Sequence, residues 1–331
     1  MLPRTISSLL IAPIAVIITS AAAISGRDPQ LSKGCGKPVP SCITLGHGKN
    51  RTIASDSAPG VPLREYRIVV PKSYDPDVAV PLILSYHGRT KDMLEQEELS
   101  QFSNASYGFK GISVYPQGLP SESGSPQWQG DPAAPSDIND IRFTLELIEE
   151  ISNTYCIDPA RVYAAGKSNG GGFVGSYLAC DPTATKKIAA FAPVSGAFYY
   201  LRNATTELPP CKPSRDVIPF MEFHGLKDNT IEYDGAQNDR NNGTTIPILD
   251  FVKDWAERDG FDPDSPKVDS LCRGAREVTR YSWDDTVVHY AYKNLFHDWP
   301  STFPNDDTNL TTCEDAEATR VILDWFSKWS L

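Results

Sequence analysis

Apolar runs of strand length alternate with segments of helical periodicity along most of this chain. The runs at 81–86 and 188–194 are apolar almost throughout, as are strands buried on both faces of a parallel sheet. Between them, the segment 138–155 carries apolar residues at helical spacing. The alternation predicts an α/β fold, with a mostly parallel sheet covered by helices on both faces. Further strands are expected at 67–70, 112–115, 162–165, 218–223 and 287–292, and further helices at 173–180, 246–258 and 316–329.

Three regions divide the chain. Residues 63–331 contain the alternation without an internal repeat or a low-complexity linker, which favours a single domain. Residues 24–62 are rich in Gly, Pro and Ser and show no period, so we expect an irregular lead-in that Cys35 and Cys42 could pin. Residues 1–23 combine a basic start, a short apolar run and an Ala-x-Ala site, which predicts a cleaved signal peptide and a secreted, extracellular protein. An N-terminal membrane anchor is the alternative.

The net charge limits the classes of binding partner, and the cysteines and sequons predict covalent modifications. The chain has 31 Lys and Arg against 42 Asp and Glu, a net charge of −11, which disfavours binding to nucleic acid or to anionic membranes. No sequence cluster has metal-ligand spacing, and we expect neither a metal nor a cofactor. The 7 cysteines predict disulfides with at least one thiol left over. Five sequons predict glycosylation, at Asn50, Asn104, Asn203, Asn242 and Asn309.

The strongest motif is Gly-Lys-Ser-Asn-Gly at 166–170, which follows a predicted strand and opens a predicted helix. In that context Gly-x-Ser-x-Gly is a nucleophile elbow, the tight turn of the α/β-hydrolase fold. The elbow presents its serine, here Ser168, at the carboxyl edge of the sheet, where the helix N-terminus can stabilise developing negative charge. A glycine-rich turn without catalysis is the alternative.

A serine nucleophile needs a base, and in this fold the chain order is serine, acid, histidine. Of the 5 histidines, only His289 and His297 lie well past Ser168 with an acid and a strand between. His289 falls in the middle of the predicted strand 287–292 and is expected to pack there. His297 lies in the loop after that strand, from which it can reach the serine, and is the predicted base.

The acid is expected in the polar turn after the predicted strand 218–223. Asp228 occupies that turn, where its carboxylate would hold the tautomer of the base and stabilise the imidazolium. A solvated turn aspartate is the alternative for Asp228, and Asp234 and Asp298 are its rivals as the acid.

An oxyanion hole needs two backbone N–H groups. One is expected from Asn169, directly after the nucleophile, and the other from Arg89 in the loop after the strand 81–86, with Gly88 and Thr90 as alternatives. The preceding residue, His87, is expected to be structural.

Substrate contacts are expected from the loops at the carboxyl edge. Trp128 and Trp299 could each stack on an aromatic acyl group or a sugar, with plain packing as an equal alternative. Gln117 and Gln129 are candidate hydrogen-bond partners. The acidic cluster at 137–140 weakly resembles a calcium loop, but its place at a helix start favours helix capping.

Several motifs together carry a family resemblance. They are Ser-Tyr-His-Gly-Arg at 85–89, Tyr-Pro-Gln-Gly at 115–118, Trp-Gln-Gly-Asp at 128–131, Ala-Ala-Gly-Lys-Ser-Asn-Gly-Gly-Gly-Phe at 164–173, Glu-Phe-His-Gly at 222–225 and His-Asp-Trp-Pro-Ser-Thr at 297–302. Over residues 33–331 the chain resembles the fungal feruloyl esterases of type C, within carbohydrate esterase family one and its relatives the polyhydroxybutyrate depolymerases. One departure is Asn-Leu-Phe-His at 294–297, where the family usually has Gly-x-Gly-His.

The resemblance implies a cofactor-free esterase that hydrolyses feruloyl esters on plant cell-wall polysaccharides, with fragments of arabinoxylan or pectin as substrate. We expect a monomer. The resemblance assigns Ser168 as nucleophile, Asp228 as acid and His297 as base. An acetyl xylan esterase or polyester depolymerase with the same triad is the first alternative. A catalytically silent binding protein on the same fold is the second.

Overall fold

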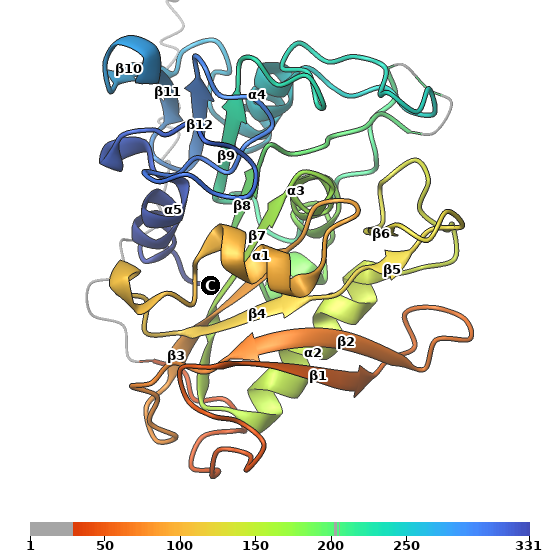
Figure 1. The fold of residues 1–331 in the computed structure, drawn as a ribbon, viewed down its shortest axis with the longest axis vertical. Helices are drawn as coiled ribbons and strands as arrows, with labels where there is room; N and C mark the ends of the chain where they lie inside the picture. The colour runs from red at the N-terminus through yellow and green to blue at the C-terminus, as the bar shows by residue number, and fades with distance from the viewer. Residues whose placement is uncertain (1–28, 202–203, 205) are drawn as a thin grey trace, which may run out of the picture.

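The computed structural model describes residues 29–201, 204 and 206–331. Its ten-stranded sheet has the order β1-β2-β4-β3-β7-β8-β9-β12-β11-β10 in the described residues (Figure 1). The six inner strands from β4 to β12 are parallel, and an antiparallel pair extends the sheet at each edge. The strands are β1 Gly48–Ala54, β2 Leu63–Val69, β3 Val80–Tyr86, β4 Ile112–Pro116, β7 Ile157–Lys167, β8 Ala190–Val194, β9 Phe220–Gly225, β10 Lys267–Leu271, β11 Val278–Trp283 and β12 Val287–Tyr292.

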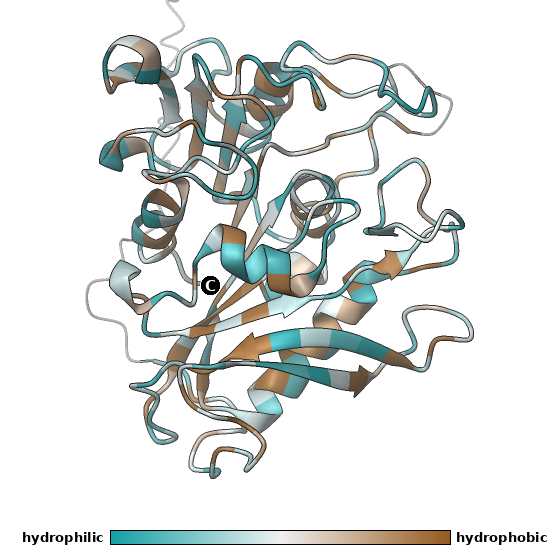
Figure 2. Cartoon of the chain, viewed as in Figure 1, coloured by the Kyte–Doolittle hydropathy of each residue, from teal (hydrophilic) through white to brown (hydrophobic). Residues whose placement is uncertain are grey.

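Helices cover both faces of this sheet. The helices are α1 Met93–Ser100, α2 Asp140–Thr154, α3 Asn169–Phe173, α4 Ile248–Arg258 and α5 Ala318–Phe326. Phe143 of α2 and Trp255 of α4 belong to one buried cluster, whereas Ile322 and Trp325 of α5 belong to a second. Adjacent residues of one strand point to opposite faces, so Leu82 joins the first cluster and Ile83 the second. The predicted α/β architecture is confirmed, and α2 and α5 show both apolar and polar sides in Figure 2.

Several elements escaped prediction because they lack an apolar run. The segment 24–62 contains β1, so the expected irregular lead-in is wrong there. β1 and β10 are edge strands with mostly exposed residues, and α1 is short and polar. The helix expected at 173–180 begins earlier, as α3, and continues as a single π-helical turn over Val174–Leu178. A small hairpin of β5 Leu119–Pro120 and β6 Pro126–Gln127 was also unpredicted.

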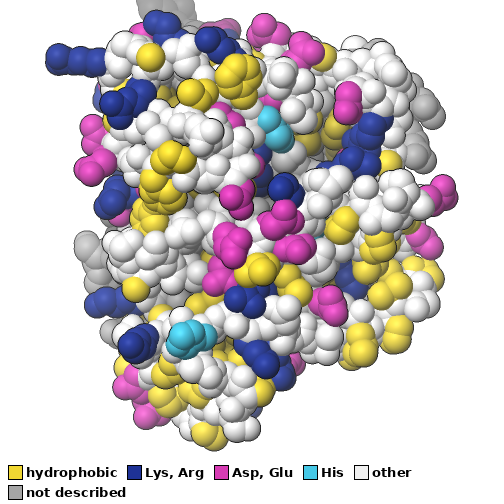
Figure 3. All heavy atoms as spheres, in the orientation of Figure 1, with side chains coloured by type: hydrophobic (Ala, Val, Ile, Leu, Met, Phe, Trp, Pro, Cys, Tyr) yellow, Lys and Arg dark blue, Asp and Glu magenta, His cyan; other side chains and the backbone are white. Residues whose placement is uncertain are grey.

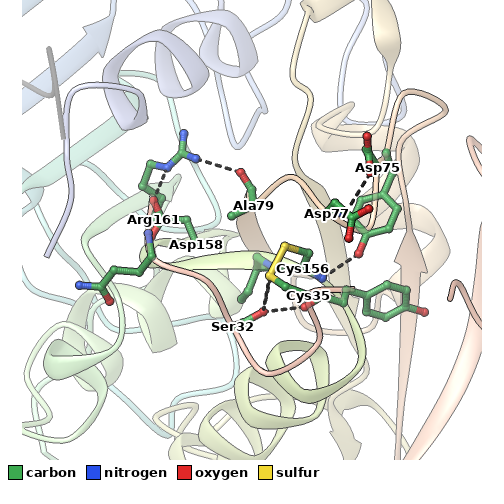
Figure 4. The surroundings of a disulfide bond; sticks show 12 residues. Ser32, Cys35, Asp75, Asp77, Ala79, Cys156, Asp158 and Arg161 are labelled. Carbon is green, nitrogen blue, oxygen red and sulfur yellow. Dashed lines mark hydrogen bonds and ion pairs between the residues drawn. A yellow bond between two sulfur atoms is a disulfide. The ribbon is translucent and has the colours of Figure 1, made fainter. Parts of the chain in front are cut away.

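Three disulfides brace the described chain, and one of them joins its N-terminal segment to the sheet. Cys35 bonds Cys156 just before β7, beside the hydroxyl of Ser32 (Figure 4). Cys35 therefore pins the lead-in as expected, whereas the expectation for Cys42 is wrong. The other pairs are Cys180–Cys211 and Cys272–Cys313. Cys42 is the odd thiol and is exposed.

Candidate active site

The predicted nucleophile lies on a strained turn between β7 and α3. Ser168 has φ 54° and ψ −118°, a left-handed conformation that costs a non-glycine residue energy. The turn is so tight that a Cβ on Gly166 would lie 2.5 Å from the carbonyl oxygen of Gly170. The amide of Ser168 donates to the carbonyl of Val194 on β8, and this bond ties the turn to the sheet. This is the backbone of a nucleophile elbow.

The predicted base and acid contact each other at the ends of β12 and β9. His297 Nδ1 lies 2.7 Å from Asp228 Oδ2 and donates to it. Asp228 Oδ1 accepts from the amides of Thr230 and Ile231, both at 2.8 Å, which fixes the carboxylate. Ser168 and His297 line the same cavity of about 300 Å³. The structure therefore brings the three residues to one place.

Electrostatics favour a neutral base and an ionised acid. Burial lowers the pKa of His297, the Lys167 ammonium lowers it further, and the Asp228 carboxylate opposes both. Burial alone would raise the pKa of Asp228, but hydrogen bonds from His224 and His297 hold it below its usual range. An unprotonated imidazole next to an ionised carboxylate is the resting state that general-base catalysis requires.

Lys167, inside the elbow motif, also holds the loop that carries the base. Its Nζ donates to the carbonyl of His297 at 3.0 Å and lies 3.4 Å from Asp307 Oδ2. The side chain is almost fully buried. Sequence reasoning missed this role, because the residue between the glycine and the serine gave no signal of its partner 130 positions later.

Both candidate oxyanion residues reach the cavity. Asn169 and Arg89 line it beside Ser168, and a Cβ on Gly88 would lie 3.3 Å from that of Ser168. His87 holds the intervening loop: its Nδ1 donates to the carbonyl of Gly88 at 2.7 Å, and its Nε2 accepts from an amide of the next loop at 2.9 Å. Burial lowers the pKa of His87 to about 4, which keeps the ring neutral.

The four candidate substrate contacts lie outside this cavity. Trp128 and Trp299 are fully buried, so each takes the packing role that the sequence left open. The Trp128 indole donates to the carbonyl of His87 and that of Trp299 to Thr319, which satisfies both N–H groups inside the protein.

The two candidate glutamines also have partners away from the cavity. Gln117 Oε1 accepts from the Met93 amide at 3.0 Å, and Gln129 Oε1 accepts from the Asp140 amide at 3.2 Å. Each glutamine side chain thus accepts a hydrogen bond at the start of a helix. The expected contact of these side chains with substrate is not seen in this arrangement.

Other residues line the cavity in their place. Tyr199 follows β8, and Asn238 and Arg240 belong to the long segment after β9. Arg240 makes a bidentate pair with the buried Asp131, at 2.7 and 2.9 Å. Acidic side chains gather near the middle of the face in Figure 3, and those that line the cavity with some exposure are Glu95, Asp239, Asp306 and Asp307.

No cluster in the described residues could hold a metal ion. The acidic segment 137–140 is a helix cap, as expected: the Asn139 side chain accepts from the Arg142 amide at 2.9 Å at the start of α2. Across the described chain, no helix has the length and apolarity that crossing a bilayer requires.

The chain is similar in sequence to several known fungal proteins. No family model matches it. It is 30% identical over 200 residues to feruloyl esterase B of Piromyces equi, which is 60% of this chain and 36% of that protein. It is 26% identical over 212 residues to feruloyl esterase C of Emericella nidulans, 62% of this chain and 70% of that protein. A bifunctional acetylxylan esterase/xylanase of Neocallimastix patriciarum is 30% identical over 51% of this chain, which spans only 22% of that enzyme. The chain thus spans about a third or less of the length of two of these relatives.

Solved structures share the fold. An acetyl xylan esterase from Aspergillus awamori superposes with a TM-score of 0.55 at 15% identity, over 84% of this chain and 98% of that one. An S-formylglutathione hydrolase from Agrobacterium tumefaciens gives 0.52 at 12% identity, over 86% and 96%. By sequence, the chain is a distant homologue of the fungal feruloyl esterases, and its fold is the α/β-hydrolase fold of the solved structures above.

Proposed function

We propose that the chain is a secreted serine esterase that hydrolyses feruloyl and related hydroxycinnamoyl esters of plant cell-wall polysaccharides. The observation that carries this proposal is the 2.7 Å contact between His297 and Asp228 beside Ser168, on an elbow at the wall of the cavity. The acyl class follows the names of the relatives, two of which are feruloyl esterases.

The geometry supports an acyl-enzyme mechanism. Ser168 Oγ attacks the ester carbonyl as His297 Nε2 takes its proton, and Asp228 stabilises the imidazolium through Nδ1. In this proposal the oxyanion accepts hydrogen bonds from the amides of Asn169 and Arg89, two residues that line the cavity with Ser168. His297 then gives the proton to the leaving alcohol. A water molecule then attacks the acyl-enzyme and gives a proton to His297. The bond between the acyl carbon and Ser168 Oγ breaks, His297 returns the proton to Oγ, and the carboxylic acid leaves.

Secretion is supported by features of the described chain. Three disulfides are unusual in a reducing compartment. The four described sequon asparagines are exposed, as glycosylation requires, at Asn50, Asn104, Asn242 and Asn309. The fifth, Asn203, and the predicted signal peptide lie outside the described residues.

The test is hydrolysis of methyl ferulate, p-nitrophenyl acetate and p-nitrophenyl butyrate by the purified chain and by Ser168→Ala. Ferulate release that disappears in the variant is the expected result. Cleavage of acetate alone would transfer the chain to the acetyl xylan esterase alternative, which the bifunctional relative also favours. A folded chain that neither cleaves these esters nor reacts with a fluorophosphonate would be a silent binding protein.

A further inference from the structure

Behind the site lies a buried charge cluster that the proposed mechanism does not use. Glu222 and His224 are two residues apart on β9, and His289 on β12 stands beside Glu222 in the parallel register. All three side chains are fully buried. Burying ionisable groups is costly unless they are paired, so each must have a partner.

His224 faces acceptors on both sides of its ring. Its Nδ1 lies 2.9 Å from Glu222 Oε1. Its Nε2 lies 2.9 Å from the carbonyl oxygen of Ile231 and 3.1 Å from Asp228 Oδ2. A neutral imidazole has a single N–H, so it could satisfy acceptors on one side alone. Two donating nitrogens make His224 an imidazolium between two carboxylates.

The protonation of His224 follows from its counter-charges. Burial alone would lower the pKa of His224, but the Glu222 carboxylate and the hydrogen bonds to Asp228 and Glu222 raise it to about 10. On the other side of Glu222, its Oε2 lies 2.8 Å from His289 Nδ1, a close approach without hydrogen-bond geometry. His289 Nε2 contacts the hydroxyl of Tyr233 at 2.9 Å.

Asp228 is the link between this cluster and the triad. The same oxygen, Oδ2, lies within hydrogen-bonding distance of His224 Nε2 and His297 Nδ1. A fixed cation on one side of the carboxylate reduces the negative potential that it exerts on the other side. The proton that His297 would bind in acid is therefore held less tightly, and the imidazole stays free to act as a base.

We propose that His224, kept protonated by Glu222, is a positioning residue that orients the Asp228 carboxylate and keeps His297 unprotonated in mildly acidic solution. This inference rests on the proposed esterase function. Other charged or titratable groups also face the cluster and are unchanged by the substitutions below. Lys167 and Asp298 lie beside His297. Tyr233 lies against His224 and His289, and Tyr281 stacks on His289.

The first experiment is the pH profile of kcat/KM for His224→Gln, measured on the best substrate of the wild-type chain. The amide of glutamine keeps a donor for Asp228 and removes the charge. We expect the acidic limb of the profile, where kcat/KM falls because His297 becomes protonated, to move to higher pH by about one unit. At pH values on this limb kcat/KM should be about tenfold lower than in the wild-type chain, and at higher pH, where the profile is flat, the loss should be smaller. Glu222→Gln should move the limb in the same direction, because His224 loses its counter-charge. The matched control is His47→Gln, an exposed imidazole whose loss should leave the limb in place.

If His224 served packing alone, His224→Gln would lower the stability or kcat but leave the acidic limb of the pH profile in place. That result in a folded His224→Gln chain would overturn the proposal. A second measurement needs no variant at position 224 to fold and no activity. In the wild-type chain, ¹⁵N spectra of the histidine rings should show two protonated nitrogens for one buried ring well above pH 7, and His224→Gln or Glu222→Gln assigns it. If every ring is neutral there, the proposal fails. Absence of Ser168-dependent hydrolysis would instead defeat the proposed function, and the ring spectra would still decide the charge of His224.

Discussion

Two charge clusters with fully buried side chains can be compared in the described part of the chain, and they differ in whether the cation can lose its proton. In the first, Arg64 of β2 pairs with Asp140 of α2 at 2.8 Å, with both side chains fully buried. In the second, His224 lies between Glu222 and Asp228, also fully buried. A guanidinium keeps its proton at any accessible pH, whereas an imidazolium loses it when its surroundings change.

The contacts of the first cluster are those of a brace. Arg64 also donates to Ser57 Oγ and to the carbonyl of Gln117, and its guanidinium lies 4.0 Å from the centre of the Phe143 ring. Asp140 Oδ2 accepts from the amide of Gln129. The pair joins β2, α2 and three loops, and none of these contacts involves a residue of the proposed triad. The second cluster ends on Asp228, the acid of the proposed triad, so in our proposal the charge of the cluster affects catalysis. The two clusters are equally buried but differ in role. The arginine cluster braces the fold, and the histidine cluster can change its charge.

The largest effect should come from breaking the second cluster where it meets the triad. We expect Asp228→Asn to lower kcat by about 10³–10⁴-fold, because the amide cannot stabilise the imidazolium and can hold the wrong tautomer. Ester hydrolysis near pH 7 measures this. The matched control is Asp298→Asn, which removes the neighbouring acid that accepts from the Phe296 amide. A loss less than about tenfold is expected there, the scale of one hydrogen bond. If the two losses were reversed, Asp298 would be the acid.

Breaking the first cluster should affect folding and not chemistry. Arg64→Met leaves the Asp140 carboxylate buried without its partner, and we expect the free energy of unfolding to fall by about 3–5 kcal/mol. Turnover per folded molecule should be close to that of the wild-type chain. Urea unfolding and active-site titration measure the two quantities. Arg142→Met is the control, since this exposed arginine pairs with Asp56 and Glu146 at the surface, where a loss of about 1 kcal/mol or less is expected. Equal losses in both variants would remove the distinction between brace and surface pair.

The second cluster should also make stability depend on pH. The pKa of His224 is raised from 6.5 to about 10 in the folded chain, so its contribution is fully present below pH 6.5 and is lost as the pH rises through about 10. The pKa of Asp228 is lowered, so its contribution is present above the unfolded value of about 4 and is lost as the pH falls further. Urea unfolding from neutral to alkaline pH should show a decline on the order of a few kcal/mol that is flatter in His224→Gln. Parallel declines would show that His224 is not its source.

The smallest expected effect concerns Lys167, the fixed cation on the other side of the base. Lys167→Met removes the hydrogen bond to the carbonyl of His297, and we expect a fall in kcat of about tenfold. The acidic limb of the pH profile should also move to higher pH, because the Lys167 ammonium lowers the pKa of His297. Lys91→Met is the control: it lines the cavity but pairs with Glu95 at the surface. A larger shift in Lys167→Met than in His224→Gln would make Lys167 the main determinant of the base's charge.

Sequence patterns predicted the parts of the fold that are buried on both sides. The inner strands are apolar runs because helices cover both faces, and the end of β7 runs directly into the elbow at Ser168. Edge strands such as β1 have one solvated face and therefore no apolar run to detect. Trp128 and Trp299 show the limit for side chains, since a loop position does not reveal whether an indole finds its partner in the core or at the surface.

The site was predictable to the extent that chain order determines it. The positions of Asp228 and His297 after β9 and β12 could be inferred, because loops after parallel strands meet at one edge. The cluster of Glu222, His224 and His289 could not, because it depends on the register between two strands that are far apart in sequence. The bond between Cys35 and Cys156 could not be predicted either, because the two cysteines are 121 residues apart in sequence.

That disulfide has a practical consequence for handling the protein. The turn between β5 and β6 is exposed at residues 122–124 and lies between Cys35 and Cys156 in the sequence, so it is a natural target for a protease. A cut there would break the backbone between β5 and β6, so that β1 to β5 lie on one piece and the remaining strands on the other. The two pieces would still migrate as one band on a gel run without thiol, because the disulfide joins them. Purity judged in that way can conceal a nicked preparation, and a reducing gel distinguishes the two.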